Sequence, residues 1–214
     1  SPQGESDVAT LNANLQSMVR GAGEQGCGYE AILEAWYRFL VNPSPHEPVS
    51  INPETDQATL EGIDQAILDQ RAQFLRPDSL LAIIMLTDEN DCSIKGGDFF
   101  YIAAQLSSGG SAYRLPKPRA ACATNPNDPC CRSCGQGPGE GCDTSNDDCD
   151  SGPLSQLEDA INLRCWDQKR RFGIDFLYPI SRYTDGLREQ TVPDESVSPA
   201  TPVANPLFVD LNPE

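Results

Sequence analysis

The sequence predicts an α/β fold in which part of a parallel sheet is flanked by helices and interrupted by a disulfide-rich irregular insertion. Three observations support this prediction. The run Leu80–Leu86 is apolar at every position, as in a strand that is covered on both faces. Segments on either side of this run have apolar residues at spacings of three and four, which is typical of amphipathic helices. Six of the nine cysteines lie between Cys122 and Cys149.

The composition excludes several classes of protein. The 214 residues include 15 Lys and Arg against 32 Asp and Glu, which gives a net charge of −17. Nucleic acids and anionic membranes bind clustered cations, and the chain has no basic run, so neither is expected as a partner. No apolar run approaches the about 20 residues of a transmembrane helix. The single His and the lack of a nucleophile motif argue against an enzyme, and no organic cofactor is expected.

The first half of the chain predicts three helices and one strand. A helix is expected over residues 7–20, with Asp7 as its cap. A second helix follows the break GAGEQGCG and places Ile32, Leu33, Trp36, Phe39 and Leu40 on one face. Residues 42–53 hold four prolines and predict a loop, so His46 is given no role. A third helix is expected from about 57 to 75, before the central strand over 80–87.

The second half predicts an insertion, a helical return and a tail. A short helix is expected over 98–106. The pattern Ser155-x-x-Glu158 is a capping box, and the helical stretch 167–187 should be kinked or split at Pro179. These features divide the chain into a core part (1–121), a Cys-rich acidic insertion (122–152), a helical return to the core (153–188) and an extended Pro-rich acidic tail (189–214).

The cysteines predict disulfides and therefore an oxidising, extracytoplasmic compartment. The adjacent Cys130 and Cys131 should have separate partners, and zinc binding through the CxxC pair is a weaker alternative. An odd total leaves one thiol unpaired or bonded outside the chain, and Cys165 could be a buried thiol on a helix face. Because the chain begins at Ser1 without Met, we expect a mature product or an excised fragment. The disulfide candidates are Cys27, Cys92, Cys122, Cys130, Cys131, Cys134, Cys142 and Cys149.

Two groups of acids are candidate sites for Ca²⁺ or Mg²⁺, which prefer oxygen ligands. The first group is Asp88, Glu89 and Asp91, which follow the predicted strand at the end where parallel sheets bind ligands. The alternative is that these acids cap a following helix or pair with nearby bases. The second group lies in the insertion, in a stretch that only loosely resembles a calcium loop and could equally be a solvated acidic loop: Asp143, Asp147, Asp148 and Asp150.

Several motifs carry a family resemblance. The stretch LLAIIMLTDENDCS resembles the central strand of a von Willebrand factor type A domain, which commonly ends in Thr-Asp. GCGYE, FLRPDSLLAIIMLTDENDCS, FLYPISRYTDGL and NPLF, in this order, resemble cysteine-rich cell-surface type-A-like proteins of myxobacteria and related bacteria, many of them lipoproteins. The resemblance implies a Rossmann-type parallel sheet and places Asp88 where the family has an aspartate of its metal-ion-dependent adhesion site. It also implies that Cys27 lies near Cys92, and we expect these two to form a disulfide unless each has another partner.

The chain also departs from the family pattern. The DxSxS loop that supplies most metal ligands, the strands before it and the loop threonine are missing. The chain therefore resembles the later, C-terminal part of such a domain, and we expect a protein partner to complete the sheet. The expected function is an extracytoplasmic protein-binding or adhesion module, which a divalent metal could assist. The alternatives are a structural subunit of a larger extracytoplasmic or membrane-associated complex and a metal-dependent hydrolase.

Overall fold

A computed structural model describes residues 5–23, 28–52, 57–77, 79–96, 103, 105–108 and 111–211. Its α-helices are α1 (Val8–Ala22), α2 (Ile32–Leu40), α3 (Gln65–Phe74), α5 (Ala121–Thr124), α6 (Gln168–Phe172) and α7 (Ile180–Gly186). Two short 3₁₀ helices are η1 (Ile161–Leu163) and η2 (Pro206–Phe208). The strands are β1 (Ser50–Asn52), β2 (Gln57–Thr59), β3 (Ser107–Ser108), β4 (Ser111–Ala112), β5 (Thr191–Asp194) and β6 (Thr201–Ala204). Among the described helices, none is long and apolar enough to cross a membrane.

The described strands form three separate antiparallel pairs: β1 with β2, β3 with β4, and β5 with β6. The mixture of helices, sparse strands and disulfides was predicted, but the parallel sheet was not found in the described part of the chain. Residues 80–87 run as chain without strand pairing. The physical reason is that a strand exists only through hydrogen bonds to a neighbouring backbone, and no described segment lies alongside this one in register. Apolar content alone therefore predicted a strand, but the described chain supplies no neighbouring strand that pairs with it.

The early helices agree with the sequence pattern. Helix α1 begins after Asp7, whose carboxylate accepts a hydrogen bond from the Thr10 amide at 2.8 Å, as predicted. Helix α2 covers the expected amphipathic stretch. The third helix begins later than predicted, because 57–59 pair with β1 and Asp64 then caps α3 through the Ile67 amide. Most of the helix expected over 98–106 lies outside the described residues.

The return segment is less helical than its sequence pattern suggests. The capping box forms, with the Ser155 amide donating to the Glu158 carboxylate at 2.8 Å, but only turns and η1 follow it. The predicted interruption of 167–187 is confirmed, since α6 and α7 are separated by residues 173–179. Gly173 adopts φ +67°, and a Cβ there would come within 2.2 Å of the Arg132 backbone. A side chain at this position would clash with the insertion, so glycine is required where the end of α6 meets it.

Residues 189–211, expected to be an extended tail, instead fold back on the chain. Strands β5 and β6 form a hairpin in which Val192 is buried. The fully buried Asn205 side chain donates hydrogen bonds of 2.8 Å to the carbonyls of Gly186 and Glu189. These bonds attach the end of the β5–β6 hairpin to the end of α7, so the C-terminal segment packs against the rest of the chain.

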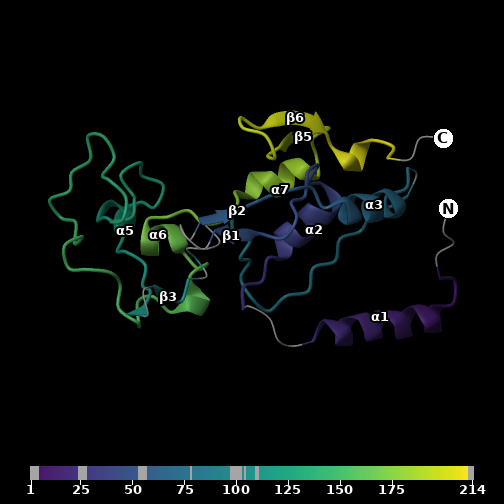
Figure 1. The fold of residues 1–214 in the computed structure, drawn as a ribbon, viewed down its shortest axis with the longest axis horizontal. Coiled ribbons are helices and arrows are strands. Elements are labelled where there is room, and N and C mark those ends of the chain that lie inside the picture. Colours follow the sequence, from purple (N-terminus) through teal and green to yellow (C-terminus); the bar gives the residue numbers. More distant parts are fainter. Residues whose placement is uncertain are drawn as a thin grey trace.

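The described chain has two apolar cores. The first, the α2–α7 core, consists of Tyr37, Leu40, Val41, Tyr183 and Val192. The second brings together residues from before and after the insertion and consists of Cys92, Ile94, Ala103, Leu115, Leu154, Cys165, Phe172 and Phe176. In Figure 1, α2, α3, α7 and the β5–β6 hairpin gather on one side, α5 and α6 lie on the other, and α1 stands apart.

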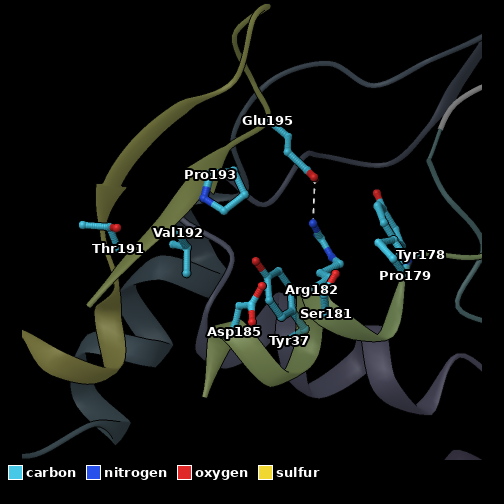
Figure 2. A pocket seen from close by; sticks show the side chains of 11 residues that line it. Tyr37, Tyr178, Pro179, Ser181, Arg182, Asp185, Thr191, Val192, Pro193 and Glu195 are labelled. Atoms are coloured by element: carbon cyan, nitrogen blue, oxygen red, sulfur yellow. Dashed lines mark ion pairs between the residues drawn. The ribbon is translucent and has the colours of Figure 1, made fainter. Parts of the chain in front are cut away.

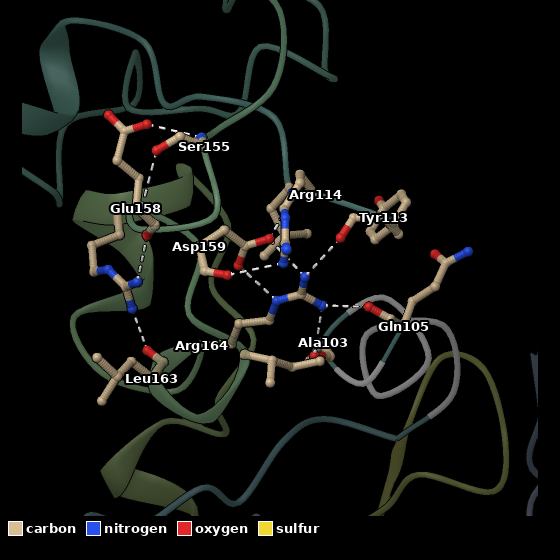
Figure 3. A network of polar contacts seen from close by, with 12 residues as sticks. Ala103, Gln105, Tyr113, Arg114, Ser155, Glu158, Asp159, Leu163 and Arg164 are labelled. Atoms are coloured by element: carbon tan, nitrogen blue, oxygen red, sulfur yellow. Dashed lines mark hydrogen bonds and ion pairs between the residues drawn. The ribbon is translucent and has the colours of Figure 1, made fainter. Parts of the chain in front are cut away.

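The second core contains a buried ion pair at its centre, shown in Figure 3. The guanidinium of Arg164 donates to both carboxylate oxygens of Asp159 at 2.7 and 2.6 Å, and both side chains are fully buried. It also donates to the carbonyls of Ala103 and Gln105 at 3.1 and 2.7 Å. Asp159 accepts a further bond from the Leu115 amide at 2.9 Å. The network therefore connects the return segment to two chain segments that precede the insertion.

The described residues form four disulfides: Cys92–Cys165, Cys122–Cys131, Cys130–Cys142 and Cys134–Cys149. The last three cross-link the insertion internally, and the adjacent cysteines have separate partners, as predicted. The expected pairing of Cys92 with Cys27 is corrected, since Cys92 bonds Cys165; Cys27 lies outside the described residues. Cys165 is therefore not a free thiol. Multiple disulfides are typical of proteins from an oxidising compartment.

Candidate functional site

Residues 80–86, which we call the apolar segment, lie at the surface. Leu81 and Ile83 pack against the α2–α7 core. In contrast, Leu80, Ile84 and Leu86 are 95%, 83% and 89% exposed. This alternation is that of an extended chain with one covered and one bare side. We call the bare side the outer face; it consists of Leu80, Ala82, Ile84 and Leu86.

The backbone of the apolar segment lacks partners as well. In the part of the chain that the structure describes, no N–H or C=O group of residues 80–86 forms a hydrogen bond with another residue. An extended chain in this state presents a row of donors and acceptors. Such a row is the feature by which an open sheet edge takes up a further strand. The apolar segment is therefore the candidate site.

The chain just beyond the apolar segment is anchored on α2. Asp91 accepts hydrogen bonds from the Leu33 amide at 3.0 Å and from the Ser93 hydroxyl at 2.8 Å. The oxygen of the same hydroxyl accepts a hydrogen bond from the Glu34 amide at 2.9 Å. The first amides of a helix need such acceptors, and Ala31 at the helix start offers none. Asp91 therefore has a capping role, but at α2, which precedes it in the chain, and not at the following helix that was the alternative to metal binding.

The other two acids of this predicted group face solvent. Asp88 and Glu89 are exposed. The Thr87 hydroxyl lies between them and the chain before α2, donating to the Glu30 carboxylate at 3.2 Å and accepting from the Glu89 amide at 3.0 Å. Neither Asp88 nor Glu89 forms an ion pair with a described residue. The apolar segment thus ends in exposed, uncompensated negative charge.

Two of the four acids in the insertion bind the chain segment just before it. Asp147 pairs with Arg119 at 2.6 Å and accepts from the Ala120 amide at 2.8 Å. Asp148 pairs with Lys117 at 2.6 Å, and the hydrogen bond from that ammonium lowers the pKa of this carboxyl. Asp143 accepts from the Ser145 amide, which lowers the pKa of its carboxyl. Asp150 is exposed.

These positions do not assemble a metal centre. Among the described residues, no group of three His, Cys, Asp or Glu side chains is placed so that it could hold a metal ion. The first predicted group is split, because Asp91 turns to the α2 amides while Asp88 and Glu89 face solvent. The residues present therefore do not fit a complete Ca²⁺ or Mg²⁺ site on their own, and a metal there would need ligands from elsewhere.

The opposite end of α2 is capped by Arg71, which is 2% exposed. Its guanidinium donates to the carbonyls of Phe39, Arg38 and Asn42 at 2.6, 2.9 and 2.7 Å. Burial lowers the pKa of Arg71 to about 10. These bonds fix α3 to the end of α2, and the apolar segment follows α3 closely. A groove of 510 Å³ opens where the two meet, lined among others by Leu75, Arg76, Leu81, Leu187 and Leu207.

Arg182 holds the α2–α7 core together at its surface. Its guanidinium lies 4.0 Å from the ring centres of both Tyr37 and Tyr178. It makes two hydrogen bonds of 3.0 Å to Glu34 and an ion pair of 2.8 Å with Glu195, which Figure 2 shows reaching down from the hairpin. Burial alone would lower the pKa of Arg182, but the bonds and charge of these carboxylates raise it. Each guanidinium nitrogen of Arg182 thus has a carboxylate partner, although the side chain lines a pocket of 220 Å³.

The tyrosines around Arg182 predict an alkaline transition. Burial raises the pKa of Tyr37, Tyr178 and Tyr183 above the usual value of a phenol. A group whose pKa is raised on folding contributes stability below its unfolded pKa and loses it as the pH rises through the folded value. The free energy of unfolding should therefore fall above about pH 10.

Ultraviolet absorbance of phenolate during an alkaline titration measures this effect. These three tyrosines should ionise late and together with unfolding. Tyr178→Phe should remove one late ionisation. Ionisation of all tyrosines in one step near pH 10, with the chain still folded, would contradict the prediction.

Helix α1 is a second surface without cover. None of its 15 residues is buried. Its apolar side chains recur at helical spacing and are all at least half exposed: Val8, Leu11, Leu15, Met18 and Val19. A helix gains most of its stability from packing such a stripe against another element. The apolar side of α1 therefore also lacks its expected contact.

The sequence pattern found the apolar segment but missed the charged residues that position it. Arg71, Arg164 and Arg182 had no signal, because an Arg at helical spacing is normally assigned to the solvent side. Arg164 lies directly before Cys165, and a cation beside a buried cysteine was the one available hint. For Asp91 the stated alternative was the capping of a following helix, and its sequence position gave no signal that it caps α2.

No protein-family model, no curated protein and no solved structure matches this chain. The apolar segment, the acids at its end and the bare side of α1 are therefore the features from which its function is inferred.

Proposed function

We propose that this chain is an extracytoplasmic protein-binding module whose apolar segment is completed by a strand from a partner polypeptide. One observation carries the proposal: the segment is apolar at every position, yet only one of its sides is covered. Its free backbone groups supply the main-chain bonds of strand addition, and its side chains supply specificity. The finer fold, a type-A-like parallel sheet with residues 80–87 as its central strand, belongs to this proposal.

The contacts around the apolar segment hold it in an extended conformation in the absence of a partner. Leu81 and Ile83 fix its inner side on the α2–α7 core. The bonds of Asp91 to α2 hold the far end. A pre-positioned strand loses less conformational entropy on binding than a mobile one. Metal assistance is retained only for a partner that brings further oxygen ligands next to Asp88 and Glu89.

A second candidate function is a structural subunit of a larger extracytoplasmic complex. The observation in its favour is α1, whose 15 residues include none that is buried. The helix is about 22 Å long, and a seven-residue strand spans about 23 Å. A partner that covers both α1 and the outer face would bury apolar side chains of two separate elements, and permanent interfaces are more hydrophobic than transient ones.

Peptide selection with matched variants tests the proposed function. A displayed library of random peptides is selected on the full chain and then measured on two lysine variants. Ile84→Lys changes the outer face, and Leu157→Lys is the control, because Leu157 is 94% exposed and lies outside the apolar segment. Both side chains are exposed, so neither change should alter stability by more than about 0.5 kcal/mol.

Enriched peptides should be extended and apolar, and Ile84→Lys should weaken their binding at least about tenfold. Leu157→Lys should leave binding unchanged. A selection with and without millimolar Ca²⁺, repeated on Asp88→Asn, shows whether a metal contributes. Peptides that bind wild type and Ile84→Lys equally well would contradict the proposal.

A further inference from the structure

We propose that the partner strand is apolar along its length, carries lysine or arginine at one end and places an aromatic side chain near the other. This inference rests on the proposed function, because it states the chemistry of the polypeptide that the apolar segment binds. The surface changes in character along the segment. It begins at an apolar groove, continues as a bare face with unpaired backbone groups, and ends in negative charge.

The negatively charged end consists of three acids next to Thr87, which we call the acidic end: Glu30, Asp88 and Glu89. The Thr87 hydroxyl donates to the Glu30 carboxylate at 3.2 Å and accepts from the Glu89 amide at 3.0 Å. All three acids are exposed, and none forms an ion pair with a residue that the structure describes. A partner strand that reaches Thr87 therefore gains from a cation at this end, whereas an acid there is repelled.

The charge of the whole chain acts in the same direction. Its net charge of −17 attracts a basic polypeptide at long range and raises the rate of association. At physiological ionic strength this attraction is screened beyond about 8 Å. The preference that remains is therefore set by the acids that the bound strand contacts. We expect a cation at one end of the partner, not a basic composition throughout.

The groove at the start of the apolar segment offers a place for a large apolar side chain. It has a volume of 510 Å³, and Leu81 of the apolar segment forms part of its lining. Phe208 and Val209 also line it and are 49% and 42% exposed. Pockets of about 300–1,000 Å³ are typical of sites that bind organic groups. An aromatic ring suits such a site, because rings bury much apolar area and have few rotatable bonds.

The groove end shows no clear preference for charge. Arg76 lines the groove from a turn in which the Ser79 hydroxyl donates to the Arg76 carbonyl at 2.8 Å. Asp210 lines the same groove. The acid next to Arg76 in sequence, Asp78, lies outside the described residues. Because the lining carries both signs of charge, the apolar residues of the groove decide what it binds.

The alternation of side chains places the aromatic residue in the partner. Residues directly opposite each other in paired strands point to the same side of the sheet. Leu81 packs inward and lines the groove, so the partner residue opposite Leu81 points toward the groove and carries the ring. Partner residues opposite Leu80, Ile84 and Leu86 point outward. They should be apolar, because apolar cross-strand pairs stabilise a sheet.

Two designed peptides test this partner on the full chain. The first, Lys-Lys-Val-Thr-Val-Thr-Val-Trp-Val, fits an antiparallel pair, and the second has the reverse order and fits a parallel pair. Both are acetylated and amidated, so that no terminal charge remains. Fluorescence anisotropy of dye-labelled peptide gives the dissociation constant. One of the two should bind, and Ile84→Lys should weaken it at least about tenfold. Leu157→Lys should leave it unchanged, and failure of both peptides to bind overturns the proposed partner.

Exchange of the two peptide lysines for glutamates tests the acidic end. On wild type this exchange should raise the dissociation constant about tenfold. The double variant Asp88→Asn with Glu89→Gln should bind the lysine peptide about fivefold more weakly, and the difference between the two peptides should shrink. Higher salt should weaken the lysine peptide and not the glutamate peptide. Equal binding of both peptides to wild type overturns the cation.

The aromatic residue is tested by a peptide with alanine in place of tryptophan. This peptide should bind wild type about tenfold more weakly. Val209→Lys places a charge in the groove at an exposed position, and should weaken the tryptophan peptide but not the alanine peptide. A variant that weakens both peptides equally, or neither, overturns the groove as the site of the ring.

The outcomes separate this inference from the function on which it rests. Library peptides that depend on Ile84 but carry neither a terminal cation nor an aromatic residue overturn this partner and leave the protein-binding function. Designed and selected peptides that all ignore Ile84→Lys overturn both. Self-association of the chain that is lost in Ile84→Lys, measured by sedimentation velocity, assigns the surface to a second copy and overturns the basic partner. Circular dichroism of each variant shows that it is folded.

Discussion

Replacement of Arg164 by Ala is expected to lower the free energy of unfolding by about 3–5 kcal/mol. The change removes every donor of a guanidinium that is completely buried. Asp159 would remain in the interior as an uncompensated charge, and the carbonyls of Ala103 and Gln105 would lose their hydrogen bonds. Taking a charge out of water without a partner is among the largest penalties that one substitution can cause. Denaturant unfolding followed by circular dichroism measures the loss.

Two further variants make this measurement specific. Arg188→Ala removes an exposed Arg without an ion pair in the described chain, and should change stability by less than about 0.5 kcal/mol. Arg164→Met combined with Asp159→Leu replaces the ion pair by apolar side chains and should recover much of the loss. If Arg164→Ala costs no more than Arg188→Ala, the buried network does not hold the second core.

Removal of the Cys92–Cys165 disulfide is expected to cost about 4 kcal/mol, against about 3 kcal/mol for Cys130–Cys142, from the entropy of the loops that they close. The two bonds span 73 and 12 residues. The longer loop restricts the unfolded chain more, and its cysteines are also part of the second core. Paired Cys→Ala variants, compared by denaturant unfolding, give both values.

The insertion bond serves as the internal control for this comparison. Both double variants lose two cysteines and one cross-link, so their difference reports loop length and burial. The variant without Cys92–Cys165 should also unfold over a wider region, since this bond joins the chain after the apolar segment to the return segment. Equal costs for the two bonds would show that loop closure does not decide their contributions.

Local elements with a strong pattern could be predicted from sequence. The cap at Asp7 and the apolar stripe located α1, and Pro179 located the break between α6 and α7. The crowding of cysteines identified the insertion as a cross-linked unit. Each of these signals acts between residues that are close in sequence. They are the capping of a helix, the proline ring that interrupts one, and the closure of short loops by disulfides.

The failures share a different cause, because they depend on contacts between distant segments. The run LLAIIML has the composition of a buried strand, but whether it is paired depends on another backbone that no local pattern can reveal. The chain has nine cysteines, any eight of which already allow 105 connectivities, and spacing does not choose Cys165 as the partner of Cys92. The start of the third helix was predicted too early, because residues 57–59 form β2 and pair with β1.

The candidate site was predicted only in part. Its apolar character was evident, and so were the acids at its end. The different environments of those acids were not evident. Asp91 binds an amide at the start of α2, 58 residues earlier in the chain, and sequence spacing does not reveal such a contact. Composition places charges near one another in sequence, but only folding decides which of them remain free for a ligand.

Helix α2 takes its N-terminal acceptors from Asp91 and Ser93 and its C-terminal donor from Arg71, and none of these belongs to its own flanks. The apolar segment lies between these two sources in sequence. We therefore expect occupancy of that segment and the order of α2 to be thermodynamically linked. A ligand that pulls the segment from its seat uncaps the helix, while one that steadies it makes the helix harder to fray. Through Glu34 and Arg182 the same linkage reaches the C-terminal hairpin, so that binding at one edge would be felt at the far side of the molecule.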